Sequence, residues 1–277
     1  MQKYKVLVLD LDGTLTNSKK EVSEENKKTL IEAQKKGVKI VLASGRPTYG
    51  IVPIAQELEI ENYGGYILSF NGGTIINWAT KEKVYESVLP NHVVPGLYND
   101  AKDHGFTILS YKDDHIITEN KEDKYVGVEA HLNKMAVKEV PCFLSAVPES
   151  LPKCLIVGNQ EELATLEKKM QTKYGECMSI YRSEPFFLEL MPQNIDKAQS
   201  LQRLLDHLSL TKEEMIACGD GYNDLTMVEF AGMGVAMANA QDAVKNVSNY
   251  ITLSNDEDGI AHVVKKFILD KGYSPNA

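Results

Sequence analysis

Four short polar segments of this 277-residue chain follow apolar runs, and together they carry residue types that bind cations and anions. Residues 10–14 read DLDGT, residues 44–46 SGR, residues 71–73 NGG and residues 219–224 GDGYND. Carboxylates are ligands for hard divalent cations such as Mg²⁺. Glycine-flanked turns leave backbone N–H groups free to hold an anion. Gathered in one place, these segments would bind a cation together with a phosphate-like anion.

The apolar runs before these segments predict the elements that position them. Residues 6–9, 40–43, 66–68 and 215–218 are continuously apolar, as in strands buried on both faces of a parallel sheet. Stretches between such runs predict helices, one capped by Ser23 and another from Lys197 to Leu210. This alternation predicts an α/β fold with a doubly wound parallel sheet. Because ligands bind at the carboxyl ends of such strands, we expect the four segments to converge.

The middle of the chain has a different pattern. Residues 106–118 predict a hairpin, residues 154–158 a strand followed by a helix, and residues 179–190 two more strands around a turn. Hairpins mixed with helices indicate an α+β domain. We therefore expect an inserted domain at 84–188 and a discontinuous core domain made of 1–83 and 189–277.

The convergence creates an electrostatic problem. Asp10, Asp12, Asp220 and Asp224 would bring up to four carboxylates together, and like charges raise one another's pKa unless a cation cancels them. Mg²⁺ would do so, and so would Lys197. The alternative for Lys197 is a solvated helix residue paired with its neighbour Asp196.

Two asparagines also have structural alternatives. Asn71-Gly72 is a common turn dipeptide, so a ligand role and a turn role for Asn71 are both open. Asn239 is expected to cap a helix.

Composition excludes several classes of function. Lys and Arg number 30 against 39 Asp and Glu, a net charge of −9, which disfavours binding to nucleic acid or to anionic membranes. The four cysteines form no C-x-x-C pair, so neither a zinc site nor a disulfide framework is expected. No apolar stretch is long enough to span a membrane. We expect a cytoplasmic protein.

The four segments, in this order, resemble the signature motifs of the haloacid dehalogenase (HAD) superfamily. DLDGT matches its first motif, Ser44 the second, Lys197 the third and GDGYND the fourth. The resemblance covers nearly the whole chain and is closest to the Cof-type phosphatases, which carry a large C2-type cap domain between the second and third motifs.

This resemblance implies specific roles in Mg²⁺-dependent phosphoryl transfer. Asp10 would be the nucleophile and Asp12 the general acid and base. The expected phosphate-binding residues are Ser44, Gly45, Lys197 and Asn223, and the expected metal-binding residues are Asp10, Asp12 through its backbone carbonyl, Asp220 and Asp224. Asp224 would either hold a metal-bound water or fix Lys197. Arg46 and Asn71 are possible substrate-binding residues.

The expected function is hydrolysis of a small phosphate monoester, such as a sugar phosphate, a nucleotide or pyridoxal phosphate, by a monomer or homodimer. Asp12 favours hydrolysis because it can protonate an alkoxide leaving group. A phosphomutase with the same aspartyl-phosphate chemistry is an alternative. A non-catalytic phosphate-binding protein is another, although such a protein would be expected to have lost Asp10 or Asp12. Dinucleotide binding at Gly219-x-Gly221 is disfavoured, because Asp224 would repel a pyrophosphate.

Overall fold

The computed structural model describes residues 3–148 and 150–269, which divide into two units. Unit 1 comprises Met1–Tyr85 and Asp196–Ala277, and unit 2 comprises Glu86–Ile195. The expected boundary at 188 falls inside a strand of unit 2, Phe187–Pro192, so unit 2 extends further along the chain than the sequence pattern indicated.

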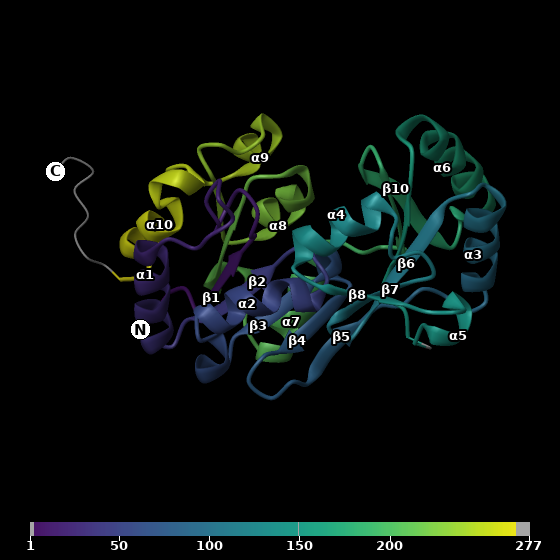
Figure 1. The fold of residues 1–277 in the computed structure, drawn as a ribbon. Coiled ribbons are helices and arrows are strands. Elements are labelled where there is room, and N and C mark those ends of the chain that lie inside the picture. Colours follow the sequence, from purple (N-terminus) through teal and green to yellow (C-terminus); the bar gives the residue numbers. More distant parts are fainter. Residues whose placement is uncertain (1–2, 149, 270–277) are drawn as a thin grey trace. The chain divides into compact units, whose positions relative to one another are not determined.

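The apolar runs form the central strands of unit 1 (Figure 1). Within the described residues, its sheet has eight strands in the order β14-β13-β12-β1-β2-β3-β4-β5. The strands from β14 to β3 are parallel, and β4 runs antiparallel to β3. Their bounds are β1 (Val6–Leu9), β2 (Lys39–Ala43), β3 (Tyr66–Ser69), β4 (Thr74–Asn77), β5 (Lys83–Glu86), β12 (Met215–Gly219), β13 (Met233–Ala236) and β14 (Tyr250–Ile251).

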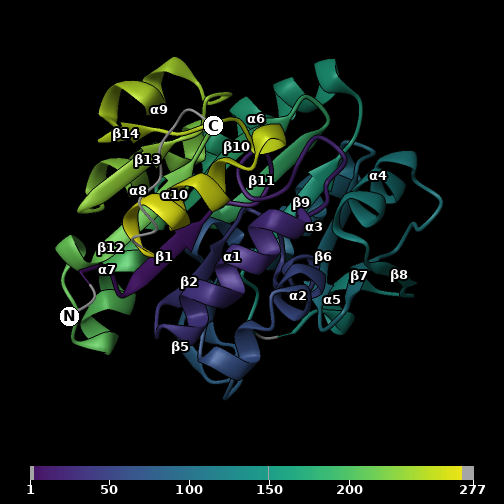
Figure 2. The ribbon, with the colours of Figure 1, turned by 90° about the vertical axis from the view of Figure 1, so that its left-hand side faces the viewer.

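Helices cover this sheet and bury its central strands. Every residue of β1 and β12 is buried, which requires cover on both faces. Helices α1 and α10 pack against each other beside β1 (Figure 2). Ser23 caps α1 as expected, its Oγ accepting from the Asn26 N–H at 3.1 Å. The helices are α1 (Glu24–Lys35), α2 (Thr48–Glu57), α7 (Lys197–Leu208), α8 (Leu225–Phe230), α9 (Asp242–Val247) and α10 (Gly259–Phe267).

Unit 2 has a mixed sheet and a core of its own. In the described part of the chain, its six strands lie in the order β10-β11-β9-β6-β7-β8, antiparallel except for β7 beside β8. Buried side chains of α3, α5 and α6 pack with one face of this sheet. The elements are α3 (Val94–Asp103), β6 (Thr107–Lys112), β7 (His115–Thr118), α4 (Lys124–Asn133), β8 (Ala136–Glu139), α5 (Phe143–Ala146), β9 (Cys154–Val157), α6 (Gln160–Tyr174), β10 (Met178–Glu184) and β11 (Phe187–Pro192).

The predicted fold class is confirmed: a mainly parallel α/β core sheet and a second, mixed α+β domain. The hairpin predicted at 106–118 is β6 and β7, and the strand pair predicted at 179–190 is β10 and β11. Among the residues described, no helix has both the length and the apolar character needed to cross a membrane.

Candidate active site

The polar segments lie at the carboxyl ends of neighbouring strands of unit 1. Because β12, β1, β2 and β3 are adjacent and parallel, the loops that follow them share one edge of the sheet. Hydrogen bonds join these loops directly. The Asp10 N–H donates to the Cys218 carbonyl at 3.1 Å, and the Asn71 N–H donates to the Ser44 carbonyl at 3.0 Å. Segments distant in sequence therefore form one site.

Three carboxylates of this site form a compact acidic cluster. Asp10, Asp220 and Asp224 each place one carboxylate oxygen within 4.8 Å of the others. Thr14 Oγ1 donates to Asp220 Oδ1 at 2.7 Å and orients that carboxylate. Gly13, at φ +89°, approaches so closely that a Cβ there would lie 2.4 Å from Asp220 Oδ2. The loop after β1 can therefore meet the loop after β12 only because residue 13 is glycine.

Lys197 is the cation buried among these carboxylates. Its Nζ donates to Asp10 Oδ1 at 2.8 Å, to Asp224 Oδ1 at 2.6 Å and to the Ala43 carbonyl at 3.0 Å. The side chain has no exposed surface. Its neighbour Asp196 caps α7 with its side chain instead of pairing with Lys197. Lys197 is thus a buried part of the site rather than a solvated helix residue.

The charges of the cluster do not balance within the protein. Burial, reinforced by the charge of Asp224, raises the pKa of Asp10 to about 8. Burial also raises the pKa of Asp220 to about 6, although its hydrogen bond from Thr14 opposes the shift. Burial alone would lower the pKa of Lys197, but Asp10 and Asp224 outweigh it and the net shift is upward. Three carboxylates face one ammonium group, so the donor set fits a divalent cation.

Asp224 uses both of its carboxylate oxygens within the protein. Oδ1 accepts from Lys197, while Oδ2 accepts from the N–H groups of Asp220 at 3.0 Å and Gly221 at 2.9 Å. A Cβ on Gly219 would lie 2.4 Å from the Cβ of Asp224, so glycine is needed where β12 ends. Of the two roles considered for Asp224, these contacts match the fixing of Lys197.

Asp12 is not part of the acidic cluster, and its carboxylate is paired with two cations. Arg46 donates from Nε to Oδ2 at 2.8 Å and from Nη2 to Oδ1 at 2.7 Å, and Lys20 Nζ donates to Oδ1 at 2.8 Å. Burial would raise the pKa of Asp12, but these cations outweigh it and the net shift is downward. Arg46, expected as a possible substrate-binding residue, therefore contacts Asp12 in this structure.

The remaining expected anion-binding residues surround the loop after β2. Ser44 is buried, and its Oγ accepts from the Arg46 N–H at 3.2 Å. Asn71 lies against Gly45, where an added Cβ would be 3.2 Å from its amide atoms. Asn223 Nδ2 donates to Asn71 Oδ1 at 3.1 Å. The structure thus places Asn71 next to the SGR segment and Asn223 next to Asn71.

Three contacts of the site were not expected from the sequence. Thr14 and Lys20 bind the carboxylates of Asp220 and Asp12. Asn239 was expected to cap a helix, but its Nδ2 donates to the Gly13 carbonyl at 2.8 Å. Helix α9 begins only at residue 242, with Gln241 as its N-cap residue. The role of Thr14 could have been predicted from the sequence, because Thr14 belongs to the DLDGT segment. No sequence pattern indicated the contacts of Lys20 and Asn239.

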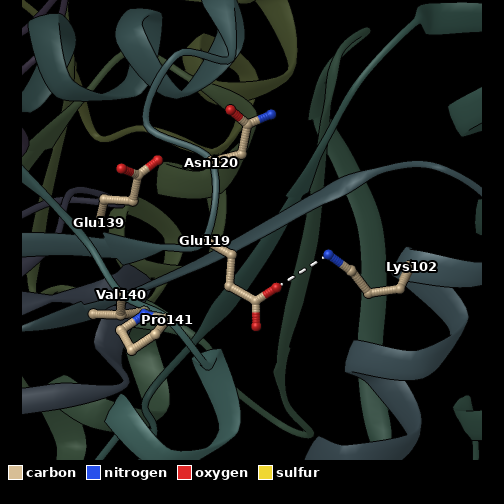
Figure 3. A pocket seen from close by; sticks show the side chains of 6 residues that line it. All are labelled: Lys102, Glu119, Asn120, Glu139, Val140 and Pro141. Atoms are coloured by element: carbon tan, nitrogen blue, oxygen red, sulfur yellow. Dashed lines mark hydrogen bonds and ion pairs between the residues drawn. The ribbon is translucent and has the colours of Figure 1, made fainter.

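A separate hollow lies in unit 2 and contains none of the expected site residues (Figure 3). Its volume is about 540 Å³. Its central carboxylate, Glu119, is already held by Tyr98, Lys102 and the Phe143 N–H. The lining residues are Lys102, Glu119, Asn120, Glu139, Val140 and Pro141. The acidic cluster and Lys197 lie in unit 1 instead.

Comparison with known proteins identifies the family. Residues 7–264 match the haloacid dehalogenase-like hydrolases. YxeH of Bacillus subtilis is 32% identical over 97% of this chain and 100% of its own length. A haloacid dehalogenase-like hydrolase from Bacteroides thetaiotaomicron is 56% identical, with a TM-score of 0.94, over 95% of this chain and 99% of that chain. A HAD subclass IIB sugar phosphatase is 25% identical, with a TM-score of 0.77, over 95% of this chain and 98% of that chain.

The second, mixed-sheet unit is the cap domain of this family. This chain belongs to the haloacid dehalogenase-like hydrolases and is a Cof-type phosphoric monoester hydrolase of subclass IIB.

Proposed function

We propose that this protein hydrolyses a small phosphate monoester in two steps, with Asp10 as the nucleophile and Mg²⁺ as the cofactor. The observation that carries the proposal is the cluster of Asp10, Asp220 and Asp224 at the strand ends of unit 1, in which the buried Asp10 and Asp224 both bind Lys197. When bound, Mg²⁺ would relieve the repulsion between a carboxylate nucleophile and a phosphate dianion. Asp10, the Asp12 backbone carbonyl and Asp220 would hold it, with Asp224 beside them.

In the first step, Asp10 attacks phosphorus and the bond from phosphorus to the leaving oxygen breaks. Asp12 supplies the proton that the leaving alkoxide takes up. Arg46 and Lys20 keep Asp12 ionised in the structure. A bound phosphate dianion beside Asp12 would raise its pKa and favour the protonated form that this step needs.

In the second step, Asp12 acts in its ionised form and removes a proton from water, which attacks the phosphorus of the aspartyl-phosphate. Inorganic phosphate leaves and Asp10 is restored. Lys197, Ser44, the Gly45 N–H and Asn223 would stabilise the charge on the equatorial phosphate oxygens. Asp224 would keep Lys197 in place, because its Oδ1 accepts from that ammonium at 2.6 Å.

The leaving group is expected to be small, from the classes of sugar phosphates, nucleotides and pyridoxal phosphate, and we propose that the cap domain selects among them. The structural similarity to a subclass IIB sugar phosphatase supports testing sugar phosphates first.

The proposal is tested with an aryl phosphate, followed by a panel of these esters. Wild-type protein should turn over with Mg²⁺ and stop when EDTA is added. Asp10→Asn should lower kcat by at least about 10³-fold, because it removes the attacking oxygen, and Asp12→Asn by about 10²–10⁴-fold. Undiminished turnover by Asp10→Asn, or turnover indifferent to EDTA, would refute the respective assignment.

A further inference from the structure

Three consecutive residues after β3 adopt backbone conformations with positive φ. Phe70 has φ +53°, Asn71 φ +54° and Gly72 φ +108°. Only glycine visits this region at no cost. A residue with a side chain is strained there, and asparagine tolerates the strain best. Such a turn persists only where its surroundings compensate, so its contacts indicate what it does.

The backbone of this turn holds the SGR segment. The Phe70 N–H donates to the Arg46 carbonyl at 3.0 Å, and the Asn71 N–H donates to the Ser44 carbonyl at 3.0 Å. In a trans peptide, the C=O and N–H groups point in opposite directions. The bond to the Ser44 carbonyl therefore directs the Gly45 N–H, an expected phosphate donor, away from the turn.

The same turn also contacts the third and fourth motifs. Asn71 Oδ1 accepts from Asn223 Nδ2 at 3.1 Å, which fixes the orientation of that exposed amide and leaves its second N–H for another acceptor. One residue further on, the Gly72 carbonyl accepts from Ser200 Oγ at 2.8 Å, in the helix that begins with Lys197. One short turn thus touches the segments that carry Gly45, Lys197 and Asn223.

We propose that Asn71 is a positioning residue for phosphate binding, which acts through Asn223 and not as a substrate ligand. The proposal rests on the proposed function, because it assumes that Asn223 faces the phosphate. The left-handed backbone lets its N–H reach Ser44 while its side-chain oxygen reaches Asn223. Loss of the Asn71 side chain releases the Asn223 amide and weakens phosphate binding.

The test is a double-mutant cycle with Asn71→Gly, Asn223→Ala and the double variant. Glycine keeps the positive φ and the bond to Ser44, so only the side chain is lost. The readouts are the Kd of inorganic phosphate with Mg²⁺ by calorimetry, and KM and kcat for an aryl phosphate. Asn71→Gly should raise Kd and KM about three- to tenfold, which corresponds to the loss of one hydrogen bond. It should change kcat less than about twofold. The double variant should bind no more weakly than Asn223→Ala.

Glu59→Gly is the matched control. Glu59 lies in the same unit with nearly the same backbone angles, φ +54° and ψ +29° against φ +54° and ψ +26° for Asn71. This variant should leave Kd and KM unchanged. Three outcomes would overturn the proposal. They are an unchanged Kd in Asn71→Gly, an equal rise in the Kd of Glu59→Gly, or a fold-increase in the Kd of the double variant that equals the product of the fold-increases in the two single variants.

Failure of this proposal is distinguishable from failure of the proposed function. If wild-type protein hydrolyses no phosphate ester, the proposed function fails, but the calorimetric cycle with inorganic phosphate still measures the coupling of Asn71 and Asn223. If wild-type turnover is normal and no coupling is found, only the role assigned to Asn71 fails.

Discussion

Within the described residues, Lys197 is the only side-chain cation that contacts the acidic cluster of Asp10, Asp220 and Asp224, with Nζ bound to both Asp10 and Asp224. Removing one partner of a buried ion pair leaves an uncompensated charge, which costs far more than the net contribution of the pair. Lys197 therefore acts on stability as well as on phosphate binding, and the two effects can be separated experimentally.

Lys197→Met should abolish turnover and lower the free energy of unfolding by about 3–5 kcal/mol without Mg²⁺. Mg²⁺ should restore part of this loss, because the cation neutralises the two buried carboxylates that the substitution leaves without their ammonium partner. Thermal unfolding with and without Mg²⁺ measures both effects.

Lys153→Met provides the matched control in the cap domain. Lys153 is also buried, and its Nζ lies 2.6 Å from Glu189 Oε2. This variant should be destabilised similarly, but Mg²⁺ should raise its Tm no more than it raises that of the wild type. An equal Mg²⁺ rescue of both variants would contradict a metal site beside Lys197.

Residue types at the strand ends were predictable, whereas their partners were not. The positions of Asp10 and Asp220 could be predicted because each residue directly follows a buried strand. Arg46 and Asp12 are 34 positions apart in the sequence, so their pairing depends on how two separate loops pack together. No local sequence pattern encodes the direction of a side chain. From the sequence, Arg46 could accordingly be named only as a possible substrate-binding residue.

At the scale of elements, the position of α7 depends on a close approach to the turn after β3. A Cβ on Gly72 would lie 2.6 Å from Ser200 Oγ and 2.9 Å from the Asp196 carbonyl. Both of these groups belong to the first turns of the helix that carries Lys197. Any side chain at residue 72 must therefore displace either the turn or the start of α7.

Gly72→Ala should lower the free energy of unfolding by about 2–4 kcal/mol, through backbone strain and steric overlap together. It should also lower kcat/KM for an aryl phosphate, because α7 shifts with Lys197. Denaturant unfolding and steady-state kinetics measure the two effects.

Gly37→Ala separates strain from overlap. Gly37 has φ +88°, but a Cβ there would meet nothing within 4 Å. This variant should lose only about 1 kcal/mol of stability and keep its kcat/KM. If both variants behaved alike, the close approach at Gly72 would not position α7.

Buried strands were the elements best predicted from the sequence, because continuous apolar runs leave little ambiguity at β1, β2 and β12. The antiparallel β4 was not predicted. It pairs with β3 directly after the turn at 70–73. Asn71-Gly72 indicated a turn here, but nothing in a phenylalanine indicates the positive φ of Phe70. The N-cap of the helix after residue 239 was misplaced because asparagine is a preferred N-cap residue type, whereas Gln241, the observed N-cap residue of α9, makes no side-chain cap hydrogen bond.

For the whole molecule, the acidic cluster predicts how stability depends on pH. The pKa of Asp10 is raised to about 8 and that of Asp220 to about 6, against 3.8 in the unfolded chain. The folded state therefore binds these protons more tightly, so their contribution to stability falls as pH rises from about 4 to about 8. Lys197, with its raised pKa, and Asp12, with its lowered pKa, stay charged across this range.

Metal-free protein should accordingly lose stability between pH 5 and pH 8, and the rise in Tm on adding Mg²⁺ should be larger at pH 8 by at least about 3 °C. Asp10→Asn should flatten most of this dependence, because the group with the larger shift is gone. A Mg²⁺ effect equal at both pH values would contradict the charge balance described above.

The division into a core and a cap domain was predictable in outline, because the element pattern changes along the chain. Its exact limits were not. The boundary at 188 divided β11, whose last residues complete the cap sheet beside β10. Sequence pattern indicates strands through their apolar residues, but it does not show which sheet a strand joins.

The central claim is that Asp10 receives the phosphoryl group, and rapid acid quench followed by borohydride reduction tests it most directly. Reduction converts an aspartyl-phosphate to homoserine, which mass spectrometry locates in the peptide. With an aryl phosphate and Mg²⁺, Asp12→Asn should accumulate the intermediate and show homoserine at residue 10. Wild-type turnover that leaves residue 10 unmodified in both proteins would contradict the account.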